Sequence, residues 1–287
     1  MAVYKRTYRG YAGNLTPAWS RFLILFQFSR RTLFRSKVQA AFFVICFFFP
    51  LLCLLGIYAN ANLSAFSFLG PRSGPVLEIN GNFFAIYLSV QAAFAFVLTA
   101  FIGPGLVSPD LANGALTLYL CRPLSRAGYV IGKMSVLFIT LSWITWLPGL
   151  VLFFVQASLS GWQWLMDNFW IAIALVASSL LGILVLSLLA LALSAWVKWR
   201  IVAGAALLGT FFLGAGFAQA INAVLRTQQG YLIDTSRLLS IVWHDLFRDP
   251  TEPVLPVTEA WMGLLALAAF CLYLLMKKVR ANEVIRD

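Results

Sequence analysis

The sequence predicts an all-α, polytopic membrane protein with six transmembrane helices. Of its 287 residues, 61% are hydrophobic and only 11% are charged, whereas a soluble domain carries about 25% charged residues. The apolar residues gather in six long runs, and about 20 such residues suffice for a helix to cross a bilayer. Because lipid offers no hydrogen-bond partners to an open backbone, these runs are expected to be helical.

The six expected spans account for one membrane domain over residues 38–276. The alternative is a soluble protein with buried core helices, but such helices are shorter and alternate with amphipathic ones. The spans are predicted at Val38–Ala59, Phe83–Val107, Met134–Phe154, Trp170–Trp196, Ile201–Leu225 and Thr258–Met276.

Residues 1–37 are expected to form a cytoplasmic tail and then an amphipathic helix that lies in the headgroup plane. The Arg30-Arg31 pair argues against a simple extension of the first span, because a charge at mid-bilayer costs about 2.5–3.5 kcal/mol. The apolar residues of this segment recur at helical spacing: Trp19, Phe22, Leu23, Phe26, Leu33 and Phe34.

Lysine and arginine set the predicted topology. The net charge is +11, and most of the 21 basic residues lie before the first span, after the second and fourth, and in the 277–287 tail. The alternate loops hold only Arg72, Arg226, Arg237 and Arg248. Because basic residues are retained on the cytoplasmic side, both termini are predicted to be cytoplasmic. The charges lie at span ends, so they face anionic lipid head groups and do not indicate nucleic acid.

The loop at residues 226–257 is the longest of the outer loops, and a helix is expected inside it. Asp234 can cap that helix, and Asp249-Pro250 can end it. Such a helix would rest on the outer leaflet or cap the bundle. Its predicted apolar face is Leu238, Leu239, Val242, Leu246 and Phe247, and its polar face is Arg237, Ser240, His244 and Asp245.

Several candidate sites are weak. The Gly128–Met134 segment superficially resembles a phosphate-binding loop, but its glycines are separated by three residues instead of four and Met134 replaces the hydroxyl residue. Lys133 is therefore expected to snorkel to the head groups. His244 is the only histidine and its neighbours point to other helix faces, so neither a catalytic trio nor a metal site is expected.

The spans hold almost no ionisable side chain, which disfavours an ion-coupled carrier, and an enzyme activity of the chain's own is not expected. Gln91 and Asn222 are expected to be interhelical hydrogen-bond partners. The four cysteines are expected to be free thiols. The small residues Gly204, Gly209, Gly214 and Ala218 in the fifth span predict either packing within one subunit or a dimer interface, and both remain open.

The inner loop, residues 108–133, carries the strongest signal. Pro109-Asp110 can start a short helix, and Arg122-Pro123 can end it. Leu111, Ala115 and Leu118 form an apolar stripe between them. A short helix held below the membrane could be a lever for a cytosolic partner, or the loop could be an ordinary solvated connector.

This loop resembles the first cytoplasmic loop of ABC-2 type permeases, the membrane subunits of type V ABC exporters. The resemblance is carried by Asp110, Gly114-Ala115-Leu116, Leu120-Cys121-Arg122-Pro123-Leu124-Ser125-Arg126 and Gly132-Lys133. It extends to the six spans, the helix before the first span, the long last outer loop and the basic tail.

The resemblance implies a transport subunit, in a bacterial-type inner membrane, that pairs with a second permease subunit in a homo- or heterodimer. A separate cytosolic ATPase would bind ATP and Mg, so no cofactor is expected on this chain. The residues that would contact the ATPase through a coupling helix are Asp110, Gly114, Leu118, Arg122, Pro123 and Arg126. The helix before the first span would be the elbow helix. The alternative is a membrane anchor that recruits an ATPase for mechanical work without transport.

Overall fold

The computed structural model describes residues 36–62, 78–114, 126–197, 199–249 and 253–278. Those residues form helices and connecting turns, with no strand among them. Six helical stretches are long and apolar enough to cross a membrane. The predicted fold class, an all-α polytopic membrane protein, is therefore confirmed. The expected elbow helix before residue 36 lies outside the described residues.

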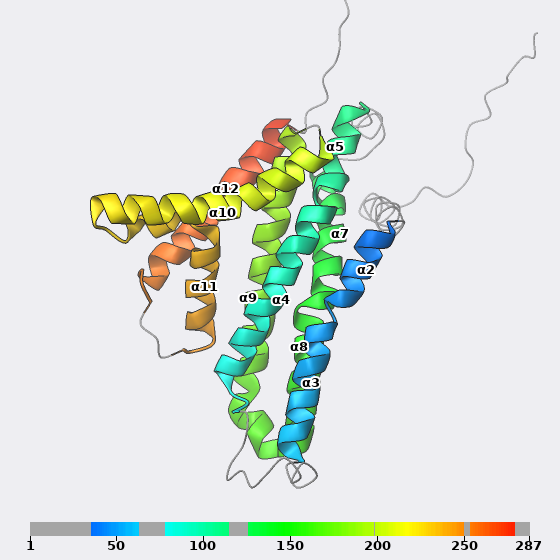
Figure 1. Ribbon diagram of the computed structural model, residues 1–287, viewed down its shortest axis with the longest axis vertical. Helices are drawn as coiled ribbons and strands as arrows, with labels where there is room; N and C mark the ends of the chain where they lie inside the picture. Colours follow the sequence, from blue (N-terminus) through cyan, green and yellow to red (C-terminus); the bar gives the residue numbers. More distant parts are fainter. Residues whose placement is uncertain (1–35, 63–77, 115–125, 198, 250–252, 279–287) are drawn as a thin grey trace, which may run out of the picture.

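The first three spans are each built from two helices, and the last three from one (Figure 1). The paired helices are α2 (Lys37–Ile45) with α3 (Phe48–Ala61), α4 (Gly81–Ile102) with α5 (Pro104–Ala112), and α7 (Arg126–Ile144) with α8 (Trp146–Ser160). The single helices are α9 (Trp162–Trp196), α10 (Arg200–Leu225) and α12 (Val257–Lys278), and the loop between α10 and α12 holds η3 (Gln229–Ile233) and α11 (Thr235–Leu246).

The helix α9 is the centre of the bundle. It is 35 residues long and almost wholly apolar after its first two turns, and it packs against α4, α5, α7, α8, α10, α11 and α12. Small residues such as Gly182, Ser187 and Ala190 are buried along it, which lets neighbouring helices approach closely. The first span, α2 with α3, is placed instead by its contacts with α4 and α8.

One end of the bundle carries most of the described basic residues. The start of α10 and the ends of α5, α9 and α12 lie at this end, which is at the top of Figure 1. The basic residues of these segments and of the starts of α2 and α7 are Lys37, Arg126, Lys133, Arg200, Lys277 and Lys278. Their gathering at one end matches the charge pattern from which the cytoplasmic side was predicted.

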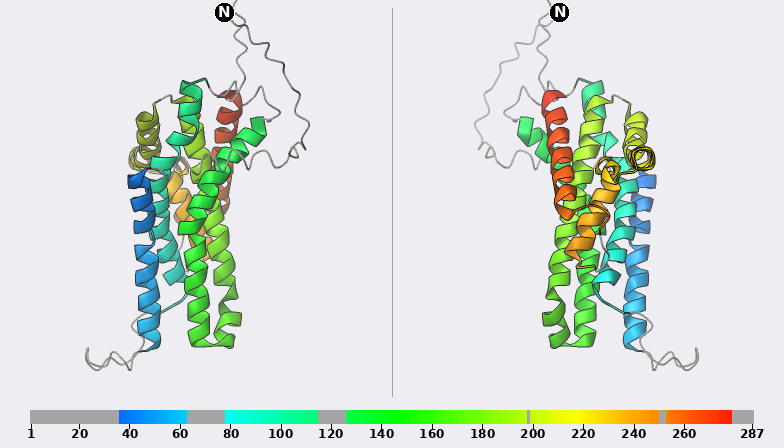
Figure 2. Two further views of the ribbon diagram at one scale, coloured as in Figure 1. Left: turned by 90° about the vertical axis from the view of Figure 1, so that its right-hand side faces the viewer. Right: turned by 90° about the vertical axis from the view of Figure 1, so that its left-hand side faces the viewer.

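The helix α10 has nearly the bounds that the sequence predicted, but it does not run parallel to the neighbouring helices. It runs across the long axis of the bundle in Figure 1, and the turned views of Figure 2 show it nearly end-on. Only Ala203, Gly204, Leu207 and Ala218 of this helix are buried. The remainder leaves a wide apolar surface uncovered, on which Phe212 and Phe217 are among the exposed residues.

The amphipathic helix expected in the long outer loop is present as α11. The Asp234 carboxylate accepts hydrogen bonds from the backbone N–H groups of Ser236 and Arg237 at 3.0 and 3.2 Å, so it caps the helix as predicted. Leu238, Leu239 and Val242 are buried as expected. The helix is more deeply placed than a surface cap, because it packs against α12, α9 and α4.

Two expected boundaries moved because of local chemistry. The second span begins at Gly81 and not at Phe83, because Asn80 caps α4 by accepting a hydrogen bond from the N–H of Phe83 at 3.2 Å. The third span begins at Arg126 and not at Met134, because the helix continues beyond the apolar run into the basic segment. Apolarity marks only the part of a helix that lies in lipid.

The breaks inside the paired spans leave backbone carbonyls that neighbouring side chains satisfy. Pro50 has no N–H, so the carbonyl of Cys46 lacks its helical donor, and the side-chain amide of Gln91 donates to it at 2.8 Å. At the α7–α8 break, the Tyr87 hydroxyl donates to the carbonyl of Thr145 at 2.9 Å. The predicted interhelical role of Gln91 is confirmed.

At the α4–α5 break, the carbonyl of Phe101 accepts two hydrogen bonds. The side-chain amide of Gln39 on α2 and the guanidinium of Arg200 on α10 each donate to it at 3.1 Å. Asn222, the other predicted partner, accepts a hydrogen bond from the N–H of Gly230 at 2.8 Å and fixes η3 against α10. Polar side chains within the bundle therefore serve the backbone of neighbouring elements.

We predict that Gln91→Leu lowers the free energy of unfolding by about 1 kcal/mol, because it leaves the Cys46 carbonyl without a donor in lipid. The measurement is unfolding of the purified protein by titration with sodium dodecyl sulfate in mixed micelles. Pro50→Ala is the matched background, because an alanine N–H can donate to the same carbonyl. The loss should fall below half in that background, and an equal loss in both would contradict the assignment.

Candidate functional site

The base of the inner loop is fixed by a buried ion pair. Asp110 lies in the last turn of α5, and Lys133 lies two turns into α7. The Lys133 ammonium is 2.8 Å from the Asp110 carboxylate, and their side chains are 6% and 16% exposed. The hydroxyl of buried Tyr129 donates to the same carboxylate oxygen at 2.8 Å. The pair therefore joins the two helices on which the loop stands.

Two expectations for these residues change. Lys133 does not extend from its helix as a snorkelling lysine would, because its ammonium is paired with Asp110 and its side chain is buried. Asp110, which was expected to contact a partner, is engaged inside the chain. The short helix also does not start at Pro109, which lies inside α5. Pro104 already fills the first turn, where a missing N–H costs nothing.

Ser108 joins α5 to the end of α9. Its backbone N–H donates to the Ser194 hydroxyl at 2.9 Å, and its own hydroxyl lies 2.9 Å from the carbonyl of Ser194 and 2.8 Å from that of Val197. The Ser194 hydroxyl also contacts the carbonyl of Pro104 at 3.1 Å. Because Val197 lies in the short link between α9 and α10, this network joins three spans at the basic end.

The six predicted coupling residues are not equivalent in the structure. Gly114 and Arg126 are exposed beside the loop, and Gly114 has a φ of +64° with open space where a side chain would project. Asp110 faces α7. Leu118, Arg122 and Pro123 lie outside the described residues. Reasoning from sequence missed Tyr129, although its spacing of four residues from Lys133 places both on one helix face.

The small residues of α10 serve mostly to pack the chain on itself. A side-chain carbon at Gly204 would lie 2.9 Å from the carbonyl of Ala100, and one at Gly214 would lie 3.3 Å from that of Ile233. Ala218 is fully buried. Gly209 meets only Leu213 of its own helix. Packing within the subunit therefore accounts for three of these positions, and the dimer interface stays a prediction.

The Gly128–Met134 segment and His244, the two weak candidates from the sequence, form structural contacts in the described residues. Gly128–Lys133 is helical within α7 and so offers no phosphate-binding loop. His244 pairs with Asp249 at 2.8 Å, and the indole of Trp243 donates to the carbonyl of Ser178 at 3.0 Å. Among the residues searched, none of the groups of histidine, cysteine and acidic side chains could hold a metal ion.

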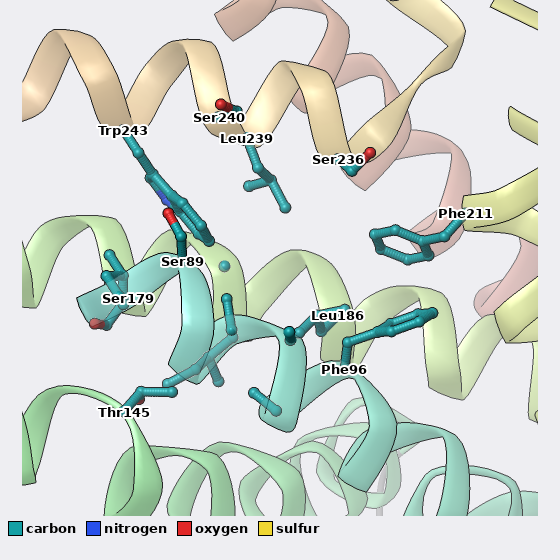
Figure 3. Close-up of a pocket in the computed structure, with 16 residues that line it drawn as sticks. Ser89, Phe96, Thr145, Ser179, Leu186, Phe211, Ser236, Leu239, Ser240 and Trp243 are labelled. Carbon is teal, nitrogen blue, oxygen red and sulfur yellow. The ribbon is translucent and has the colours of Figure 1, made fainter. Parts of the chain in front are cut away.

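A cavity of about 330 Å³ lies between α4, α9, α10 and α11, with Thr145 at the α7–α8 break also lining it. Figure 3 shows Trp243 and Ser89 toward one end and Phe96 and Phe211 toward the other. Nothing in the sequence pattern had indicated it, because its walls come from four separate helices. Its lining residues are Leu88, Ser89, Ala92, Ala93, Ala95, Phe96, Thr145, Ser179, Gly182, Ile183, Leu186, Phe211, Ser236, Leu239, Ser240 and Trp243.

No protein-family model matches the sequence, and no curated protein matches it. The chain is a multi-pass membrane protein by its six apolar helices.

We predict that Asp110→Asn destabilises the protein by about 3 kcal/mol, because it leaves the Lys133 ammonium buried without its partner charge. The measurement is again unfolding in mixed micelles. Asp110→Asn combined with Lys133→Met removes both charges and should recover most of the lost stability. A double variant no more stable than Asp110→Asn would show that the pair is not the source of the effect.

Proposed function

We propose that the chain is the transmembrane subunit of an ATP-binding cassette exporter, and that a separate cytosolic ATPase drives it. The observation that carries the proposal is the loop base: residues 115–125 stand on two helices that Asp110 and Lys133 lock together. The loop segment has the spacing of the ABC-2 coupling loop. Two helices that are locked together can transmit force from the segment between them to the bundle, whereas loosely held helices cannot.

The route of that force follows the contacts of α5. A push on the loop moves α5 and α7 together through the Asp110–Lys133 pair, and Ser108 passes the motion to α9 and to the link before α10. ATP can shift the equilibrium between two conformations of the membrane subunit only if the ATPase binds one of them more tightly than the other. The lever of the proposal is therefore α5 with the start of α7, while α9 is the central element that it moves.

A second permease subunit is part of the proposal, in a homo- or heterodimer. The exposed apolar residues of α10 include Ile201, Phe212, Phe217 and Val224, and Gly209 offers a small-residue contact beside them. Lipid can cover this face in a single subunit. A second subunit would cover it with complementary packing, which is the force that drives association of helices in membranes.

The proposed location is a bacterial-type inner membrane with both termini in the cytoplasm. The basic end of the bundle supports this orientation. A non-transporting anchor that recruits the same ATPase is the alternative. The cavity favours transport, because an anchor has no need of a lined space inside the bundle. Substrate movement in vesicles that is sensitive to vanadate separates the two functions.

We predict that Gly114→Trp uncouples the complex without unfolding it. A side-chain carbon at Gly114 would meet no atom of the described residues within 4 Å, so a large side chain that projects there would obstruct a docked ATPase. Gly114→Asn is the matched control, because asparagine tolerates a positive φ and is small. In reconstituted complex with its ATPase, Gly114→Trp should lower substrate-stimulated ATP hydrolysis at least about ten-fold, equivalent to about 1.4 kcal/mol, and Gly114→Asn should lower it little. Full activity of Gly114→Trp would refute the docking position.

We predict that Cys121 reacts with an impermeant maleimide only from the cytoplasmic side. The sequence places it between α5 and α7, whereas Cys46 and Cys271 are buried and Cys53 lies within the first span. The measurement compares intact cells with inverted membrane vesicles. Cys121→Ser is the control and should abolish the label. Labelling of Cys121 in intact cells would place the loop outside and exclude an ATPase there.

A further inference from the structure

We propose that the cavity between α4, α9, α10 and α11 binds the hydrocarbon chain of a membrane lipid that enters sideways from the bilayer. This inference goes beyond the proposed function, because it concerns a ligand site and requires no ATPase. It rests on the volume, the lining chemistry, the depth and the opening of the cavity.

The volume suits part of a small ligand. At about 330 Å³, the cavity is at the lower end of the range that small-molecule pockets occupy. Most of its walls are apolar and favour apolar molecules over water, while the buried Ser179 hydroxyl, which has no hydrogen-bond partner among the described residues, can take one polar atom. The cavity lies between four helices, and a segment of one hydrocarbon chain is narrow enough to enter between them.

The lining excludes a charged ligand. None of the described side chains that line the cavity is ionisable, and most are alanine, leucine, isoleucine, phenylalanine or tryptophan. Thr145 and Ser89 already donate their hydroxyl protons to the carbonyls of Leu141 and Ala85 on their own helices. A carboxylate, phosphate or ammonium would lose its hydration there without a partner charge. The group that lies inside is therefore uncharged and mainly apolar.

The depth and the opening point to lipid as the source. The cavity faces the middle of α4 and of α9, the parts farthest from both ends of the spans, where the bilayer is hydrocarbon. Ser89 and Ala93 line it and are also exposed at the surface of α4. These two small side chains leave a lateral opening. The polar head of the lipid stays outside the cavity.

The walls of the cavity are held from two sides. The rings of Phe96 on α4 and Phe211 on α10 are 4.4 Å apart, and Figure 3 shows them together at one end. At the other end Trp243 is anchored to Ser178, with Gly182 beside it, where an added side-chain carbon would lie 3.0 Å from the indole. The cavity therefore spans the gap between α10 and α11, and a shift of either helix would change its volume.

The test uses the full chain in phosphatidylcholine vesicles that contain a phosphatidylcholine with a photoactivatable diazirine in one acyl chain. After illumination, labelled residues are located by mass spectrometry. Leu239 is the diagnostic residue, because it lines the cavity but is only 5% exposed, while Phe212 is 72% exposed and reports contact with bulk lipid. We expect label on both residues.

Ala92→Phe fills the cavity, and Val90→Phe, on the same helix but outside the cavity, is the matched control. Relative to Phe212, label on Leu239 should fall about ten-fold in Ala92→Phe and stay within about two-fold in Val90→Phe. Wild-type protein that is labelled at Phe212 but not at Leu239 overturns the proposal. Equal labelling of Leu239 in wild type and Ala92→Phe overturns it as well. Because mapping in the wild type decides the first outcome, misfolding of a variant leaves the proposal testable.

Discussion

The need of every backbone carbonyl for a donor inside lipid governs this structure. Three of the six apolar stretches are broken, and a carbonyl left without a donor at such a break would be unsatisfied in a solvent that cannot hydrogen-bond. Gln91 donates to the Cys46 carbonyl, Gln39 and Arg200 donate to that of Phe101, and the Tyr87 hydroxyl adds a second donor to the Thr145 carbonyl, which also accepts from the N–H of Gly149. Each donor fixes the position of one span against another. These polar side chains serve the backbone of neighbouring spans, and together with the close packing of α4, α5, α7 and α8 on α9 they fix how the first spans lie against one another.

Polar side chains also bond to partners in neighbouring helices at the basic end of the bundle. Asp110, Lys133 and Tyr129 satisfy one another, and Ser108 with Ser194 joins α5 to α9 through four short contacts. A buried pair of this kind contributes little net stability when compared with apolar packing. Its consequence is geometric, because it fixes the relative positions of the two helices that carry the inner loop. A partner bound to the loop would therefore move α5 and the start of α7 together, and the proposed coupling depends on this joint movement.

The cavity and the direction of α10 belong together. A helix that crosses the bundle axis cannot pack along α4 and α9 for its whole length, so a space remains where α11 enters from the outer loop. The Phe96–Phe211 contact closes one end of that space, and Trp243 closes the other. The network at Ser108 reaches the link that precedes α10. A contiguous set of contacts thus runs from the loop base to α10, whose Phe211 lines the cavity, which gives the proposed ATPase coupling and the proposed lipid site one structural connection.

The sequence by itself determined the fold class, the approximate bounds of the spans, the cap at Asp234 and the apolar face of α11, because these depend on local hydropathy, periodicity and capping chemistry. It also identified Gln91 and Asn222 as hydrogen-bond partners, because an amide in lipid requires a partner whatever the fold. It could not name the Cys46 carbonyl as that partner, nor place Lys133 against Asp110, because both choices depend on which helices are neighbours. The tertiary structure alone decided the direction of α10, the use of Gly204, Gly214 and Ala218 for packing within the chain, and the existence of the cavity. Those features arise from contacts between segments far apart in sequence, and no local pattern encodes the distance between two helices.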